Sequence, residues 1–184
     1  MCSTGGWAGS SVRAGARVLG VLLALAGAAA ADDKAGRVVD EENGFELTVP
    51  AGWQRATLVD ADSVDELEGM FTCDATGQVL IIANIPGSTD GAYQGKDEFF
   101  AGVERGIAKG FTGYARLSSR HFLLGKLPVY DLWFRATRDG KDVALGARYL
   151  FFKGRALSLV IDLPGARKPD KATRAILESF KPLK

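Results

Sequence analysis

Apolar and polar residues alternate along several short stretches of the chain, a period of two that is typical of strands with one buried face. The first stretch covers residues 44–49 and ends at Pro50-Ala51-Gly52, where proline and glycine predict a tight turn. Residues 79–82 are apolar without alternation, which predicts a strand covered on both faces. Further strands, separated by short glycine-containing turns or other breaks, are expected at residues 54–58, 70–74, 79–85, 115–124, 129–138, 143–153 and 156–162.

Two other stretches show the helical period instead. Residues 96–109 place four apolar side chains on one helical face: Phe99, Phe100, Val103 and Ile107. A second helix is expected to begin after Asp170, which suits the N-cap position. The order of strands, helix, antiparallel strands and helix predicts an α+β domain, with a mainly antiparallel sheet of about six to seven strands.

The N-terminal part of the chain has the pattern of a secretory signal. Two arginines precede an apolar run at residues 18–25, which leads into small residues ending at Ala31. The run is shorter than the roughly 20 residues that span a bilayer. We therefore expect residues 1–31 to be a signal peptide cut before Asp32, which predicts a periplasmic or secreted protein. Cys2 precedes the run, where a lipid-modified cysteine would follow it, so no lipid anchor is expected.

After the signal, residues 32–43 are expected to be charged and loosely ordered, and residues 44–184 to form one domain. Signal removal turns the formal net charge of +1 slightly negative, which gives no reason to expect nucleic acid as a partner. Acids outnumber bases over residues 32–95, and the reverse holds over 96–184. Either the two halves interleave in one sheet and neutralise each other, or they form a dipolar docking surface.

The mature chain is poor in catalytic side chains. It has a single histidine, His121, and a single cysteine, Cys73, whereas most hydrolytic, redox and metal chemistry uses clusters of such groups. We therefore expect a non-enzymatic protein without a cofactor, with Cys73 buried. A serine hydrolase stays an alternative, because Ser118, Ser119, His121 and Asp131 could supply the groups of a serine triad. Ser119 and His121 are expected on the same strand face.

An acidic stretch raises the question of a metal. Its carboxylates are Asp60, Asp62, Asp65, Glu66 and Glu68. Calcium takes six to eight oxygen ligands, but Val64 stands where the helix–loop–helix calcium pattern needs its third ligand. A solvated acidic loop is the favoured interpretation, and a domain that binds calcium or a small ligand remains an alternative.

The strand over residues 129–138 carries the most distinctive pair of side chains. One of its faces is mixed, with Trp133 between Asp131 and Arg135. Tryptophan and arginine are enriched in the hot spots of protein interfaces, so these three residues are candidate partner-binding residues. Alternatively, a helix covers this face and Trp133 belongs to a second core.

Several of these segments resemble the PsbP-like superfamily. The opening strand and turn, Phe45-x-Leu47-x-Val49-Pro50-x-Gly52-Trp53, is the strongest likeness, followed by residues 124–128, 148–159 and 176–181. The resemblance implies an antiparallel sheet between helical layers and members that mostly work by binding other proteins. No functional residue is carried over, because the shared positions are structural. We predict an exported protein–protein accessory module at the cell envelope, of unknown partner and without a membrane span after signal cleavage.

Overall fold

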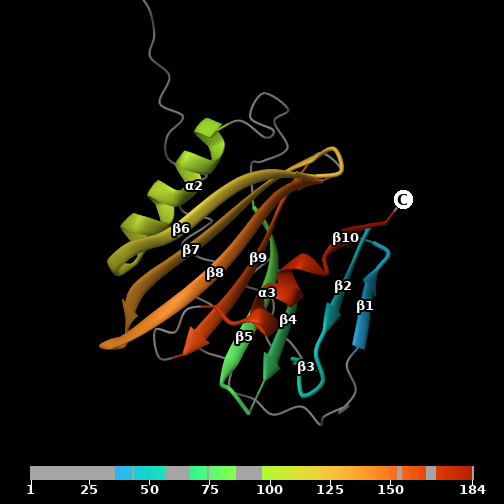
Figure 1. Ribbon diagram of the computed structural model, residues 1–184, viewed down its shortest axis with the longest axis horizontal. Coiled ribbons are helices and arrows are strands. Elements are labelled where there is room, and N and C mark those ends of the chain that lie inside the picture. The colour runs from blue at the N-terminus through green and yellow to red at the C-terminus, as the bar shows by residue number, and fades with distance from the viewer. Residues whose placement is uncertain are drawn as a thin grey trace, which may run out of the picture.

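The computed structural model describes residues 36–42, 44–56, 67–73, 75–85, 97–152, 155–164 and 169–183 (Figure 1). The predicted signal peptide lies outside these ranges. In chain order the elements are β1 (Gly36–Asp40), β2 (Phe45–Val49), β3 (Gln54–Arg55), β4 (Leu67–Cys73), β5 (Gln78–Ile85), α2 (Asp97–Gly110), β6 (Thr112–Leu124), β7 (Leu127–Arg138), β8 (Lys141–Phe152), β9 (Arg155–Pro164), α3 (Lys171–Glu178) and β10 (Lys181–Pro182).

The strands form two antiparallel sheets. The large sheet has seven strands in the order β3-β4-β5-β9-β8-β7-β6, and the small sheet has the order β1-β2-β10. Tight turns join the long C-terminal strands of the large sheet. In the turn between β7 and β8, Asp139 and Gly140 have φ values of 52° and 73°. Two consecutive positive φ angles are the geometry of a type I′ hairpin turn, which Asp-Gly favours. The predicted α+β fold with a mainly antiparallel sheet is confirmed.

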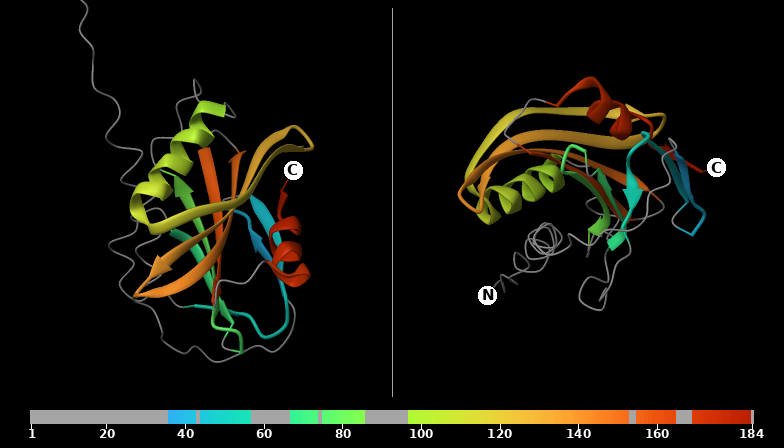
Figure 2. Two further views of the ribbon diagram at one scale, coloured as in Figure 1. Left: turned by 60° about the vertical axis from the view of Figure 1, so that its left-hand side comes forward. Right: turned by 90° about the horizontal axis from the view of Figure 1, so that it is seen from below.

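The helices lie on opposite sides of the large sheet (Figure 2). On one side, which we call the α2 face, Phe100 and Ile107 of the helix pack against apolar residues of β7 and β8, as their spacing predicted. The opposite side, the α3 face, packs against both α3 and the small sheet, with Phe45, Leu47, Trp133, Leu159, Ile176 and Leu177 in a common core. Burying both faces explains why the central strands contain long apolar runs.

The helix α3 is fixed at both ends. Asp170 is its N-cap, as expected, and accepts a hydrogen bond of 2.7 Å from the backbone N–H of Thr173. That bond lowers the pKa of Asp170, because it stabilises the carboxylate form. Just after the helix, Phe180 stacks on Phe45 of β2 with ring centroids 5.5 Å apart. The helix is thereby held between the small and the large sheet.

Two expectations need correction, one about residues 32–43 and one about how the two halves of the chain are arranged. Residues 36–40 are not a loosely ordered segment, because they form β1 and pair with β2 along its whole length. Val38 packs against the core, while Arg37 forms an ion pair with Glu46 at the surface. The two halves of the chain also do not interleave in the large sheet: β3–β5 lie at one end and β6–β9 at the other.

Candidate functional site

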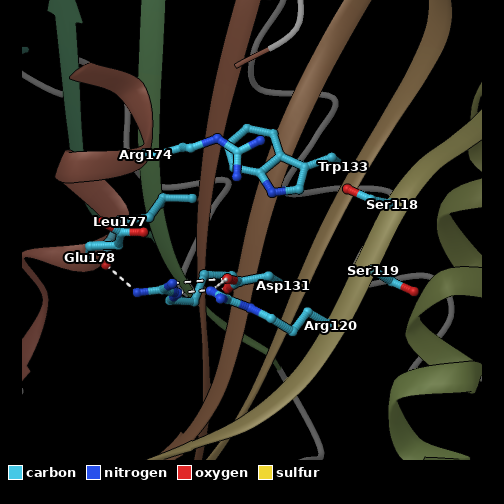
Figure 3. A pocket seen from close by; sticks show the side chains of 9 residues that line it. Ser118, Ser119, Arg120, Asp131, Trp133, Arg174, Leu177 and Glu178 are labelled. Atoms are coloured by element: carbon cyan, nitrogen blue, oxygen red, sulfur yellow. Dashed lines mark hydrogen bonds and ion pairs between the residues drawn. The ribbon is translucent and has the colours of Figure 1, made fainter. Parts of the chain in front are cut away.

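A pocket with a volume of about 220 Å³ opens on the α3 face, between strands β6 and β7 and helix α3 (Figure 3). We call it the arginine pocket. Its lining comes from four elements: Ser118, Ser119 and Arg120 of β6, Asp131 and Trp133 of β7, Arg148 of β8, and Arg174, Leu177 and Glu178 of α3. Residues distant in sequence therefore meet here because β6, β7 and β8 are neighbours in the sheet and α3 packs on the same face of it.

A buried ion pair forms the base of the pocket. Arg148 donates to both carboxylate oxygens of Asp131, from Nε at 2.7 Å and from Nη2 at 2.9 Å. This two-bond geometry is the strongest arrangement between arginine and a carboxylate. The third nitrogen, Nη1, donates to the carbonyl oxygen of Leu177 in the last turn of α3. Arg148 therefore joins the sheet to the helix as well as neutralising Asp131.

Arg120 brings a second positive charge to the same carboxylate. It lies opposite Asp131 in the pairing of β6 with β7, and its Nη2 donates to Asp131 Oδ2 at 3.0 Å. Its side chain is 60% exposed, and its guanidinium lies 4.4 Å from the centroid of Phe122. Asp131 thus accepts three N–H groups from two arginines, so one positive charge is left in excess.

Trp133 is a core residue that also forms a wall of the pocket. It is only 7% exposed, and its ring lies directly on Gly146 of β8, where any side chain would collide with it. Arg174 of α3 covers the ring, with its guanidinium 5.6 Å from the centroid. The alternative that a helix covers Trp133 is therefore correct, and the residue is not a freely exposed hot spot.

The opposite face carries a different polar cluster around Glu104 of α2. Its carboxylate accepts hydrogen bonds from Tyr114 at 2.7 Å and Tyr130 at 2.9 Å, and from Arg116 at 3.3 Å. Burial acts to raise the pKa of Glu104, but the bonds from the two tyrosines and the charge of Arg116 outweigh it, so the pKa is lowered. Burial and the bond to Glu104 raise the pKa of Tyr114.

The structure does not assemble a serine triad. Ser119 and His121 share the α2 face, as alternation predicted, but Ser119 hydrogen-bonds Tyr130. His121 Nδ1 lies 3.5 Å from Asp97 Oδ1 of α2, and its ring lies 4.5 Å from that of Tyr130. Asp131 is on the α3 face, held by its arginines. Figure 3 shows Ser118 and Ser119 pointing in opposite directions, with only Ser118 directed at the Trp133 side.

The other candidates fall in different places. Arg135 is exposed and shares the α3 face with Trp133, but it is not among the residues that line the pocket. Cys73 is buried and unpaired, as expected.

The proposed calcium ligands Asp60, Asp62, Asp65 and Glu66 lie outside the described residues. Within the described ranges, no group of three or more His, Cys, Asp or Glu residues is placed to hold a metal ion, and no helix there is long and apolar enough to cross a membrane.

Sequence reasoning identified Asp131 and Trp133 but missed Arg120, Arg148 and Arg174. One signal was present for Arg148, which is the only charged residue in the apolar run of residues 143–152. A lone charge inside a strand that is otherwise buried needs a partner, and Asp131 at the corresponding position of the preceding strand supplies one. Nothing in the sequence placed α3 over that strand, so Arg174 carried no comparable signal.

No protein-family model matches the sequence, and comparison with curated protein sequences gives no match. Solved structures do match. Cyanobacterial PsbP (CyanoP) from Synechocystis superposes with a TM-score of 0.54 at 16% identity, covering 87% of this chain and 98% of its own. The fold is PsbP-like. A crystal structure from Bacteroides thetaiotaomicron matches with a TM-score of 0.55 at 10% identity, covering 83% of this chain and 49% of the other.

LpqN, described as involved in cell envelope biogenesis of Mycobacterium tuberculosis, is also similar, with a TM-score of 0.49 and 14% identity over 83% of this chain and 87% of its own. At these identities the PsbP-like likeness concerns the fold alone. The arginine pocket is therefore interpreted from its own residues.

Proposed function

We propose that the chain is an exported, non-enzymatic binding domain that docks onto an acidic surface of a partner protein at the cell envelope. The docking surface is the α3 face of the outer strand β6 together with the adjoining arginine pocket, and we call it the β6 surface. The observation that carries the proposal is its charge: Arg120 of β6 and Arg148 of β8 share the single carboxylate of Asp131, and Thr112–Leu124 contains no acidic residue.

The accessibility of β6 supports this role. It is the last strand of the described sheet, paired only with β7, and most of its side chains are exposed. Leu117 and Leu123 are 38% and 67% exposed, and they are two of the three large exposed hydrophobic residues in the described ranges. Arginines along an edge strand oppose pairing with a second copy of the same strand, because like charges would meet. A partner with acidic side chains suits this surface better.

The polar residues of the domain support binding rather than catalysis. Ser119, His121 and Asp131 point to two different faces, and Asp131 is already occupied by three N–H donors. A binding domain for a small anion is the second candidate function, because the arginine pocket presents positive charge in a concave site. Export itself is supported by the signal pattern of residues 1–31.

Capture from an envelope extract tests the proposal, with the purified protein as bait at low and at high salt. A partner retained at low salt and released at high salt is expected, since exposed charges are screened by salt. Trp133→Ala is unsuitable as a probe because the ring is core. Ser118→Glu adds a negative charge at the exposed β6 surface, beside the pocket, and should abolish retention, while Ala108→Glu on the exposed side of α2 should not. Equal retention of both variants would refute the β6 surface.

A further inference from the structure

We infer that the arginine pocket binds an anionic group carrying two or more oxygens, a carboxylate or a phosphate, between Arg120 and Arg174. The inference deepens the proposed function and rests on it for the origin of the group, since an acidic side chain of the partner is the expected source. Three independent features of the pocket support it: its charge, the orientation of its donors, and the strand irregularity that makes it polar.

The lining of the pocket carries a net positive charge, with three arginines against two carboxylates. Asp131 already forms two hydrogen bonds with Arg148 in a buried pair. Arg120, which is 60% exposed, is the second arginine on that same carboxylate. Arg174 forms no ion pair with any described residue, and the only other acid of the lining is the exposed Glu178. An incoming anion would supply the missing negative charge.

The donors are already oriented. Arg174 lies over the ring of Trp133, with its guanidinium 5.6 Å from the ring centroid, which positions its N–H donors at the pocket. The ring of Trp133 packs directly against Gly146 of β8, so it cannot shift toward that strand. Arg120 is fixed by Asp131 on one side and by Phe122 on the other. Holding both side chains in place lowers the entropic cost of binding a ligand.

An irregularity in β6 makes the wall of the pocket polar. Arg116 pairs with Phe134 and Ser118 pairs with Trp133, so Leu117 is an extra residue in a β-bulge. Without the bulge, Leu117 would stand opposite Trp133 and close the pocket with an apolar side chain. Bulges often redirect a side chain beside a functional site. Here the bulge places the hydroxyl of Ser118 on the pocket side (Figure 3), where it can donate to an anion.

The volume sets the size of the group. A pocket of about 220 Å³ holds several water molecules, at about 30 Å³ each in the liquid. That space suits a phosphate ion or the end of an Asp or Glu side chain, but not a drug-sized ligand, whose pockets reach at least about 300 Å³.

The test is an NMR titration of the full-length chain labelled with ¹⁵N, following the indole N–H of Trp133. That signal is assigned as the one absent from Trp133→Phe. One arm adds inorganic phosphate and the other a short peptide with two adjacent aspartates, each against sodium chloride at matched ionic strength. We expect a saturable shift of the Trp133 signal and little change at Trp53, which lies in the core near β3.

Variants locate the site. Arg174→Gln and Arg120→Gln should each weaken binding about tenfold, equivalent to about 1.4 kcal/mol. Arg116→Gln is the matched control, because Arg116 is also a half-exposed arginine of β6 but lies on the α2 face, bound to Glu104. Equal weakening by Arg116→Gln would overturn the assignment to this pocket, since it would show only general attraction by charge.

The two ligands distinguish the sources of the anion. Saturation by the peptide alone assigns the pocket to an acidic group of a protein partner, and saturation by phosphate alone assigns it to a free oxyanion. No saturable shift with either ligand overturns the inference. Partner capture that persists in Arg174→Gln while no anion binds would leave the β6 surface standing, so the two proposals fail separately.

Discussion

The two faces of the large sheet differ in how the positive charges of their arginines are matched by carboxylates. Both have an arginine of β6 facing a carboxylate: Arg116 meets Glu104 at 3.3 Å on the α2 face, and Arg120 meets Asp131 at 3.0 Å on the α3 face. On the α2 face, the Glu104 carboxylate accepts hydrogen bonds from one arginine and two tyrosines. On the α3 face, the Asp131 carboxylate accepts hydrogen bonds from two arginines, and a third arginine lies over the ring of Trp133.

This difference separates a structural cluster from a candidate binding site. The Glu104 cluster is balanced, because its single negative charge meets a single positive charge, and its remaining partners are neutral hydroxyls. The arginine pocket is not balanced, and its excess positive charge stands at the surface. Uncompensated charge in a concave site is costly for folding unless a ligand or solvent compensates it, and this is why we assign function to the α3 face.

The largest effect is expected from breaking the buried ion pair. Asp131→Ala leaves Arg148 buried without a carboxylate, which should lower the free energy of unfolding by about 3–5 kcal/mol. Urea denaturation measures it. The double variant Asp131→Leu with Arg148→Met should recover much of the loss, because no buried charge then lacks a partner. A loss in Asp131→Ala below about 1 kcal/mol would contradict the assigned role of Asp131.

A smaller loss is expected where Trp133 rests on Gly146. Gly146→Ala places a methyl group against the indole ring, and overpacking of this kind costs about 1–3 kcal/mol. Tryptophan fluorescence should change as the ring is displaced. Gly102→Ala in α2 is the control, since its nearest atom would be 3.8 Å away and alanine favours helix by up to about 1 kcal/mol. Equal stability of the two variants would show that the ring is not confined by Gly146.

The smallest effect depends on pH and concerns the Glu104 cluster. The pKa of Glu104 is lowered in the folded state, so its contribution to stability is complete above its ordinary value of 4.5 and is lost as pH falls through the lower folded pKa. Glu104→Gln should therefore show a shallower loss of stability below about pH 5 than the unmodified protein. Denaturation series at several pH values measure the slopes, and identical slopes would mean that Glu104 gains nothing from its tyrosines.

The local sequence pattern predicted most of the helices and strands, but not which of them pack against one another. The strands around Asp139-Gly140, the α2 helix and the Asp170 cap depend on residues close in sequence, and each was confirmed. The β1 strand was missed because its pairing comes from β2 rather than from its own charged sequence. The arginine pocket was missed for a related reason: it depends on where α3 crosses β6 to β8, and that contact is set by long-range packing.

One measurement tests the central claim most directly: partner retention by Arg120→Glu and Arg116→Glu, with the free energy of unfolding measured on the same samples. Both arginines are more than half exposed, and each substitution places a new carboxylate beside an existing one, Glu104 or Asp131, so the two variants should lose similar amounts of stability. We predict that Arg120→Glu loses the partner while Arg116→Glu keeps most of it. Retention of the partner by Arg120→Glu, with the fold intact, would contradict the claim that the α3 face is the binding face.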